Sequence, residues 1–157
     1  GVMDPAPIAN VPFTGGVNTY VDDINSLLIG QGVFSYYVEA LEGTGNIYGF
    51  AENSISNIAE AYQDPLIYIP NAFVPLGEDG RNEIFLPVTT FVDFKEYEFI
   101  VFDRWGAQVF ETKELHKGWD GKIKGKYAEL GVYVYTLRYK TSRGEYLNMK
   151  GTVTLIR

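Results

Sequence analysis

Hydrophobic and polar residues alternate in short runs along most of this chain, which is the two-residue period of a β-strand. The clearest run is Gly131–Lys140. Its polar and smaller residues share one face, and the other face carries Tyr133, Tyr135, Leu137 and Tyr139. Because aromatic rings carry large apolar surfaces, we expect this second face to point into a core, with Tyr139 reaching the rim.

From residue 67 onward, turn signals separate several such runs. Glycines and other turn-forming residues occur at 77–80, 105–106, 118–121 and 142–144. The strands predicted between them are 67–69, 82–86, 96–103, 107–111, 131–140, 145–149 and 151–157. Seven short strands in about 90 residues, without a helical period of useful length, predict an all-β, antiparallel β-sandwich of the immunoglobulin type.

Residues 1–66 carry a weaker β pattern, with strands predicted at 18–23, 32–41 and 54–62. The spacing of Leu28, Phe34, Val38 and Ala40 is similar to the penultimate strand of a fibronectin type III module, although Phe34 stands where that strand has a tyrosine. A complete module needs about 90–100 residues. We therefore interpret residues 1–66 as the C-terminal part of an immunoglobulin- or fibronectin-like repeat, and residues 67–157 as a separate domain.

The composition of the chain excludes several classes of function. A 157-residue chain with 46% hydrophobic and 15% aromatic residues is typical of a folded globular protein. The formal charge of −7 and the scattered Lys and Arg residues argue against a nucleic-acid partner. No apolar run approaches the roughly 20 residues of a transmembrane helix. The lack of cysteine excludes disulfides, thiolate metal sites and cysteine nucleophiles.

The loop at residues 77–83 is the best metal candidate, because closely spaced oxygen ligands on a glycine-bearing loop suit Ca²⁺. Its candidate ligands are Asp79, Asn82 and Glu83. We favour the alternative of a plain turn, since Arg81 among them would weaken the field that a cation needs. No cofactor is otherwise expected.

His116 is the only histidine and is interpreted as a solvated loop residue. Because no catalytic motif is recognisable, we do not expect an enzyme.

Each of the two tryptophans lies in a short turn motif that permits two interpretations. Gly118-Trp119-Asp120-Gly121 could stack on a sugar, or Trp119 could cover one end of the core while Asp120 bonds turn amides. In Arg104-Trp105-Gly106, the arginine could read a ligand, or it could stack or pair locally. We favour the structural interpretation for both motifs.

Five segments in order resemble one known family. They are Ile69–Leu86, Phe102–Glu111, Gly118–Gly121, Gly131–Tyr135 and Lys150–Arg157. Together they resemble the gliding-motility-associated C-terminal domain, which is the type B sorting domain of the type IX secretion system of Bacteroidota. The residues that match the family's motifs are Pro70, Asn71, Phe73, Pro75, Gly80, Asn82, Arg104, Trp105, Gly106, Gly118, Trp119, Asp120, Gly121, Gly131, Tyr133, Lys150, Gly151 and Arg157.

This resemblance implies a secretion address rather than an enzyme. Residues 67–157 would be recognised by the type IX machinery at the outer membrane, and a surface or secreted cargo upstream in the same chain would be carried through the periplasm and out of the cell. Residues 1–7 carry neither a basic start nor an apolar signal core, so we expect any export signal to lie further upstream.

Two alternatives of other classes stay open. The sandwich could be an adhesive module that binds a glycan or a protein at the cell surface through Trp105, Trp119 or the loop at 77–83. More remotely, it could be an accessory domain of a secreted hydrolase. Fold by itself does not choose among these functions.

Overall fold

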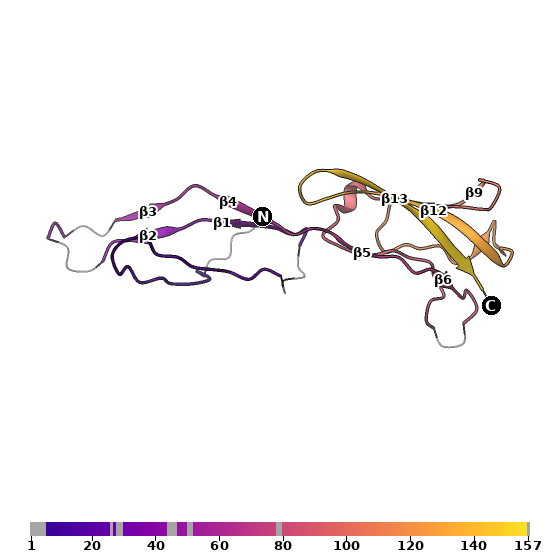
Figure 1. Cartoon of the computed structure of the whole chain (residues 1–157), viewed down its shortest axis with the longest axis horizontal. Helices are drawn as coiled ribbons and strands as arrows, with labels where there is room; N and C mark the ends of the chain where they lie inside the picture. The colour runs from indigo at the N-terminus through magenta and orange to yellow at the C-terminus, as the bar shows by residue number, and fades with distance from the viewer. Residues whose placement is uncertain are drawn as a thin grey trace.

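The computed structural model describes residues 6–25, 27, 30–43, 47–49, 52–77 and 80–156. Within these ranges the chain is built from β-strands and one short 3-10 helix, η1 (Phe94–Glu96). Figure 1 shows a slender N-terminal part that contains β1 to β4, and a sandwich that contains β5 to β13. The predicted all-β class is confirmed.

The N-terminal part is a narrow ladder of paired strands. β1 (Val33–Tyr36) pairs with β4 (Ala59–Tyr62), and β2 (Glu39–Leu41) pairs with β3 (Asn53–Ile55), both antiparallel. The predicted strands at 32–41 and 54–62 are thus each divided in two. The interruption coincides with Ser56, whose side-chain oxygen accepts a hydrogen bond from the Val38 amide (2.9 Å) in place of a backbone carbonyl.

Two other expectations concern the N-terminal part, namely the strand at 18–23 and the fibronectin-like origin. The strand predicted at 18–23 is wrong, because these residues form no strand and pair with none in the part of the chain that is described. An isolated run of extended residues has no partner for its backbone groups, so it does not form a ladder. Leu28, one residue of the fibronectin-like spacing, lies outside the described residues. The fibronectin-like origin of residues 1–66 stays a prediction.

The larger sheet of the sandwich has five strands in the order β6-β13-β12-β8-β9. The pairs are antiparallel except for β6 with β13, which is parallel. The run β13-β12-β8 matches the G-F-C order of an immunoglobulin-type sheet. The bounds are β6 (Ala72–Phe73), β8 (Glu98–Phe102), β9 (Gln108–Thr112), β12 (Gly131–Lys140) and β13 (Tyr146–Leu155).

β13 is one continuous strand, whereas the sequence predicted two, at 145–149 and 151–157. Gly151 does not break the ladder but sits directly opposite Tyr135 in it. A Cβ atom at Gly151 would lie 2.5 Å from the Tyr135 hydroxyl oxygen. Gly151 therefore leaves space for the Tyr135 ring, which extends from β12 over the backbone of β13 at this position.

The remaining strands form two short antiparallel pairs. β5 (Leu66–Tyr68) pairs with β7 (Val88–Thr90), and β10 (Lys122–Ile123) pairs with β11 (Lys126–Tyr127). The strand predicted at 82–86 is wrong, because only Phe85 pairs, in an isolated bridge with Trp119 (N···O 2.8 and 3.0 Å). Asn82 has a φ of 52°, and this left-handed residue directs the chain away from an extended path. The sequence did not predict β7, β10 or β11.

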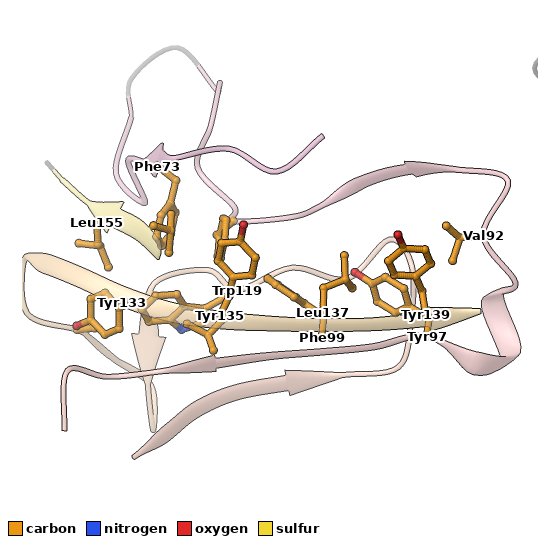
Figure 2. Packing of buried hydrophobic residues seen from close by; sticks show 14 residues of the cluster. Phe73, Val92, Tyr97, Phe99, Trp119, Tyr133, Tyr135, Leu137, Tyr139 and Leu155 are labelled. Atoms are coloured by element: carbon orange, nitrogen blue, oxygen red, sulfur yellow. The ribbon is translucent and has the colours of Figure 1, made fainter. Parts of the chain in front are cut away.

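The core between the layers is mainly aromatic, and Figure 2 shows its side chains along β12. The predicted inward face of β12 is confirmed, because Tyr133, Tyr135, Leu137 and Tyr139 are all buried. Tyr139 is only 6% exposed, so its expected position at the rim is wrong. Figure 2 shows it beside Val92, whose bridge to Thr141 closes this end of the sandwich. Most neighbouring rings meet at steep angles, for example Phe85 with Phe99 at 5.3 Å between centroids, whereas Phe73 and Phe85 are stacked.

Tyr97 is the basis of a first prediction. Its hydroxyl is buried, and no hydrogen-bond partner for it occurs in the part of the chain that the structure describes. Burying an unpaired hydroxyl costs about 1–3 kcal/mol. We therefore expect Tyr97→Phe to raise the free energy of unfolding at neutral pH by about 1 kcal/mol. Denaturant unfolding of both proteins would measure this gain, and a less stable variant would contradict it.

The same substitution should change the response to alkali. Burial raises the pKa of Tyr97 well above its usual range. Above pH about 10 the unfolded chain releases the tyrosine proton while the folded chain retains it, so stability falls as pH rises. Tyr97→Phe should therefore flatten this fall in thermal stability between neutral and strongly alkaline pH. Tyr68→Phe, at an exposed position, is the matched control and should leave the fall unchanged.

Candidate functional site

The described residues of the loop at 77–83 assemble no metal site. Among the described residues, no group of three or more His, Asp or Glu side chains could hold a metal ion. Asp79 lies outside the described residues. Asn82 has a left-handed backbone, and its carbonyl oxygen accepts the Val74 amide (2.8 Å), which joins the two sides of this loop at its base. Glu83 is half-buried, and His116 is exposed, as predicted. The calcium site, which is the less favoured of the two interpretations of this loop, stays untested.

Trp119 is part of the core. Its side chain is 0% exposed, and its indole Nε1 donates a hydrogen bond to the Lys122 carbonyl oxygen (2.9 Å). The indole lies edge-on to the Tyr133 ring with centroids 4.7 Å apart. The Asp120 carboxylate accepts the Lys122 amide (3.1 Å), as predicted for a turn. The buried indole has no open face for a sugar, so the structural interpretation of this motif is confirmed.

The two glycines of the same motif permit close approach of neighbouring segments. A Cβ atom at Gly118 would lie 2.6 Å from the Phe85 carbonyl oxygen. At Gly121, where φ is +73°, it would lie 2.4 Å from Pro75 Cγ. Both distances are too short for any larger residue. The motif therefore joins the turn after residue 117 to the segments around Phe85 and Pro75.

Trp105 has the opposite environment. Asp103 accepts hydrogen bonds at one carboxylate oxygen from the amides of Trp105 (2.9 Å) and Ala107 (2.8 Å), which fixes the turn between β8 and β9. Gly106 supplies the left-handed residue of this turn, with φ +83°. The turn holds the Trp105 side chain outward, where it is 72% exposed. The indole therefore presents a large aromatic surface to solvent at the end of the sandwich where β8 turns into β9.

Arg104 stacks on its neighbour, as predicted. Its guanidinium carbon lies 4.0 Å from the centroid of the Trp105 ring, and its Nη2 lies 3.4 Å from Glu129 Oε2. The ion pair is exposed and contributes little to stability. Together the two contacts orient the arginine along one face of the indole.

A hollow of about 260 Å³ lies beside Trp105 and is called the Trp105 hollow here. Tyr133 forms part of its wall, fixed by the hydrogen bond from its hydroxyl to the Glu129 carbonyl oxygen (2.7 Å). The Lys122 ammonium lies 5.1 Å from the centroid of the Tyr127 ring. Carboxylates, one lysine and apolar groups share the lining, which consists of Asp103, Trp105, Ile123, Lys126, Tyr127, Ala128, Glu129 and Tyr133.

Sequence reasoning missed the residues that β10 and β11 contribute to this hollow. The signal for this hairpin is Lys124-Gly125, with φ of 50° and 80°. Two left-handed residues between paired strands form the tight turn that suits a β-hairpin. Lysine is uncommon at such a position, and this explains why the segment resembles a loop in sequence.

Two of the remaining motif residues, Asn71 and Phe73, bond to the last strand of the sheet. Asn71 and Phe73 accept the amides of Thr154 (2.9 Å) and Ile156 (3.1 Å) at their carbonyl oxygens, which joins β6 to β13. Phe73 is also buried. Lys150 is exposed, Pro70 is half-buried, and Arg157 lies outside the described residues. Gly80 and Gly131 have positive φ and space around them, which indicates a conformational role.

Among the described residues, no helix is long and apolar enough to cross a membrane. No curated protein matches significantly.

One solved structure that is similar is the crystal structure of CopC from Methylosinus trichosporium OB3b, with 23% identity and a TM-score of 0.31. The match covers 41% of this chain and 65% of that one. A family model matches residues 67–155, more than half of the chain, with its Trp105 and Trp119 turns. The chain belongs to the CHU_C type IX secretion signal domain family.

Proposed function

We propose that residues 67–157 act as a secretion address, through which the type IX machinery recognises this chain and carries an upstream cargo across the outer membrane. Membership of a type IX secretion signal family is the observation that carries the proposal. Such a signal implies export to the cell surface or secretion. The address works by protein–protein recognition of a folded sandwich, and no catalytic step is required.

We assign the recognition to the Trp105 hollow. Tryptophan, tyrosine and arginine dominate the binding energy of protein interfaces, and Trp105, Tyr127 and Arg104 occur together at this end. Asp103 holds the turn in place before any partner arrives, which reduces the ordering cost of association. Charges of both signs surround the rings, which suits a protein surface better than a polyanion.

Trp105→Ala should separate recognition from folding. Because the indole is 72% exposed, its removal should change the free energy of unfolding by no more than about 0.5 kcal/mol. Export of a fluorescent reporter fused to this chain in a type IX host should fall about tenfold, if the indole is an interface anchor worth about 1.4 kcal/mol or more. The measurement is reporter in the medium and on cells relative to reporter inside.

Tyr68→Ala is the control, since Tyr68 is also an exposed ring of the sandwich. Its export should stay normal. Normal export of a stable Trp105→Ala variant would remove the Trp105 hollow from the proposal while leaving the secretion role intact. A reporter fused to the native chain that stays inside the cell would contradict the secretion role itself.

The adhesive alternative has one specific observation in its favour. Trp105 and the 42% exposed Tyr127 line a hollow with carboxylates, and such an arrangement can stack on a sugar ring and bond its hydroxyls. Calorimetric titration of the purified chain with polysaccharides tests it. Saturable heat that disappears in Trp105→Ala would support binding of a glycan. No heat with any of them would leave secretion as the proposed function.

A further inference from the structure

The end of the sandwich opposite the Trp105 hollow meets the N-terminal part of the chain. β12 runs from Gly131, beside the hollow, to Lys140, and its ten residues separate the two ends by roughly 30 Å. Figure 1 shows the N-terminal ladder extending from the end where β12 finishes. We call the meeting residues the Phe91 junction, and they are Gly32, Gln63, Asp64, Phe91, Ser142 and Arg143.

Phe91 is buried by this junction rather than by the core. It is 4% exposed, yet every other buried hydrophobic residue among the described ones belongs to the core cluster, and Phe91 does not. Its ring lies against Gly32 of the N-terminal part, where a Cβ atom would be 2.9 Å from Phe91 Cβ and Cγ. Only glycine fits there without displacing the ring.

The backbone of Phe91 is adapted to this contact. Its φ is +62°, a left-handed conformation that is unfavourable for a bulky residue and persists only where the surroundings fix it. The next residue, Val92, is buried in the core and bridges to Thr141. The unusual turn therefore sends one side chain into the core and its neighbour toward the N-terminal part.

Polar contacts close the junction around Gln63. The Ser142 hydroxyl donates to the Gln63 carbonyl oxygen (2.8 Å), and the Gln63 amide donates to the Gly32 carbonyl oxygen (2.8 Å). The Gln63 side-chain amide donates to the Ile24 carbonyl oxygen. Arg143 and Asp64 form an exposed ion pair at 3.6 Å, which adds little. One residue thus connects segments of both parts.

We propose that the Phe91 junction is a docking surface for the preceding segment of the same chain, and that it holds this segment in one orientation on the sandwich. Neighbouring modules with small interfaces usually move relative to each other. Here the connection from β4 to β5 is only residues 63–65, and Gln63 within it is bonded to both sides. The junction keeps the Trp105 hollow pointing away from whatever precedes the sandwich. The proposal does not depend on the secretion role.

Gly32→Ala tests the junction, and the chain offers a matched control in Gly30→Ala. Both glycines have left-handed backbones, with φ of +72° and +66°, so the conformational cost of alanine is similar. Only Gly32 faces Phe91, because nothing lies within 4 Å of a Cβ atom at Gly30. The difference between the two variants therefore reports the contact with Phe91 alone.

The readout is the distance distribution between two spin labels, which is accessible because the chain has no cysteine of its own. Exposed Asn57 and Lys117, one in each part, take the labels as Asn57→Cys and Lys117→Cys. We expect one narrow distribution for the native background and for Gly30→Ala. We expect Gly32→Ala to lose the narrow peak, and Ser142→Ala to broaden it less.

Tryptophan emission of the unlabelled variants, to which the buried Trp119 and the exposed Trp105 both contribute, should stay unchanged, which shows that the sandwich is folded. A broad distribution in the native background would overturn the proposal. So would a Gly32→Ala distribution as narrow as the native one, or equal broadening in Gly30→Ala.

Discussion

Replacing Trp119 with alanine is expected to lower the free energy of unfolding by about 3–5 kcal/mol, the cost of removing a large core aromatic. The indole is fully buried and contacts Tyr133 (4.7 Å) and Phe73 (5.3 Å between centroids). Its removal also leaves the Lys122 carbonyl oxygen without its indole donor. Since small domains have only about 5–15 kcal/mol in total, the variant should be close to unfolding.

Chemical denaturation followed by far-ultraviolet circular dichroism measures this loss. Trp105→Ala is the matched control, because it removes the same side chain from an exposed position. The free energies of unfolding of the two variants should differ by most of the loss expected for Trp119→Ala. If Trp119→Ala were as stable as Trp105→Ala, the burial of Trp119 would not be a source of stability. A reporter fused to the Trp119→Ala chain should also fail to be exported, but because the sandwich unfolds and not because a recognition contact is lost.

Deleting Gly151–Arg157 is expected to abolish the cooperative fold of the sandwich. The deletion removes Val153 and Leu155, which are both buried in the core. It also removes the pairing of β13 with β6 and with the first half of β12. Two strands would then lose their hydrogen-bond partners at once, in addition to the lost apolar burial. The combined loss is on the order of the whole 5–15 kcal/mol stability of a small domain.

Thermal unfolding and reporter export test this deletion together. Thr152→Ala is the control, because the Thr152 side chain is exposed on the other face of β13 and should be dispensable for folding. The truncated protein should give no cooperative transition, and its reporter should remain inside the cell. A truncated chain that unfolds cooperatively and is exported normally would contradict both the role of β13 in the core and the secretion role.

Several features of this protein are determined by its sequence alone. The alternation in Gly131–Lys140 is enough to predict β12 and its inward face, because strand period is a property of consecutive residues. The burial of Trp119 follows from a large apolar ring between turn glycines, and the exposed stacking of Arg104 on Trp105 follows from their adjacency. Ordered motifs along residues 67–157 also predict the family, which the matching family model confirms.

Other features are decided only by tertiary structure, because they depend on a partner far away in the chain. In sequence, Gly151 is typical of a strand break, but in the structure it lies opposite Tyr135 within a continuous strand. The run at 82–86 has the pattern of a strand, but only Phe85 pairs with another segment. The Trp105 hollow needs the β10–β11 hairpin beside the turn after β8.

The Phe91 junction is the clearest case of this dependence. Nothing in the sequence around Phe91 predicts a left-handed aromatic residue, since that conformation is unfavourable locally. The ring packs against Gly32, 59 positions earlier, and the Ser142 hydroxyl bonds Gln63 across 79 positions. Local pattern determines which residues form strands and which face of a strand is apolar. Which groups cover that face, and where an unfavourable backbone is stabilised, are determined by contacts between segments that only the folded chain brings together.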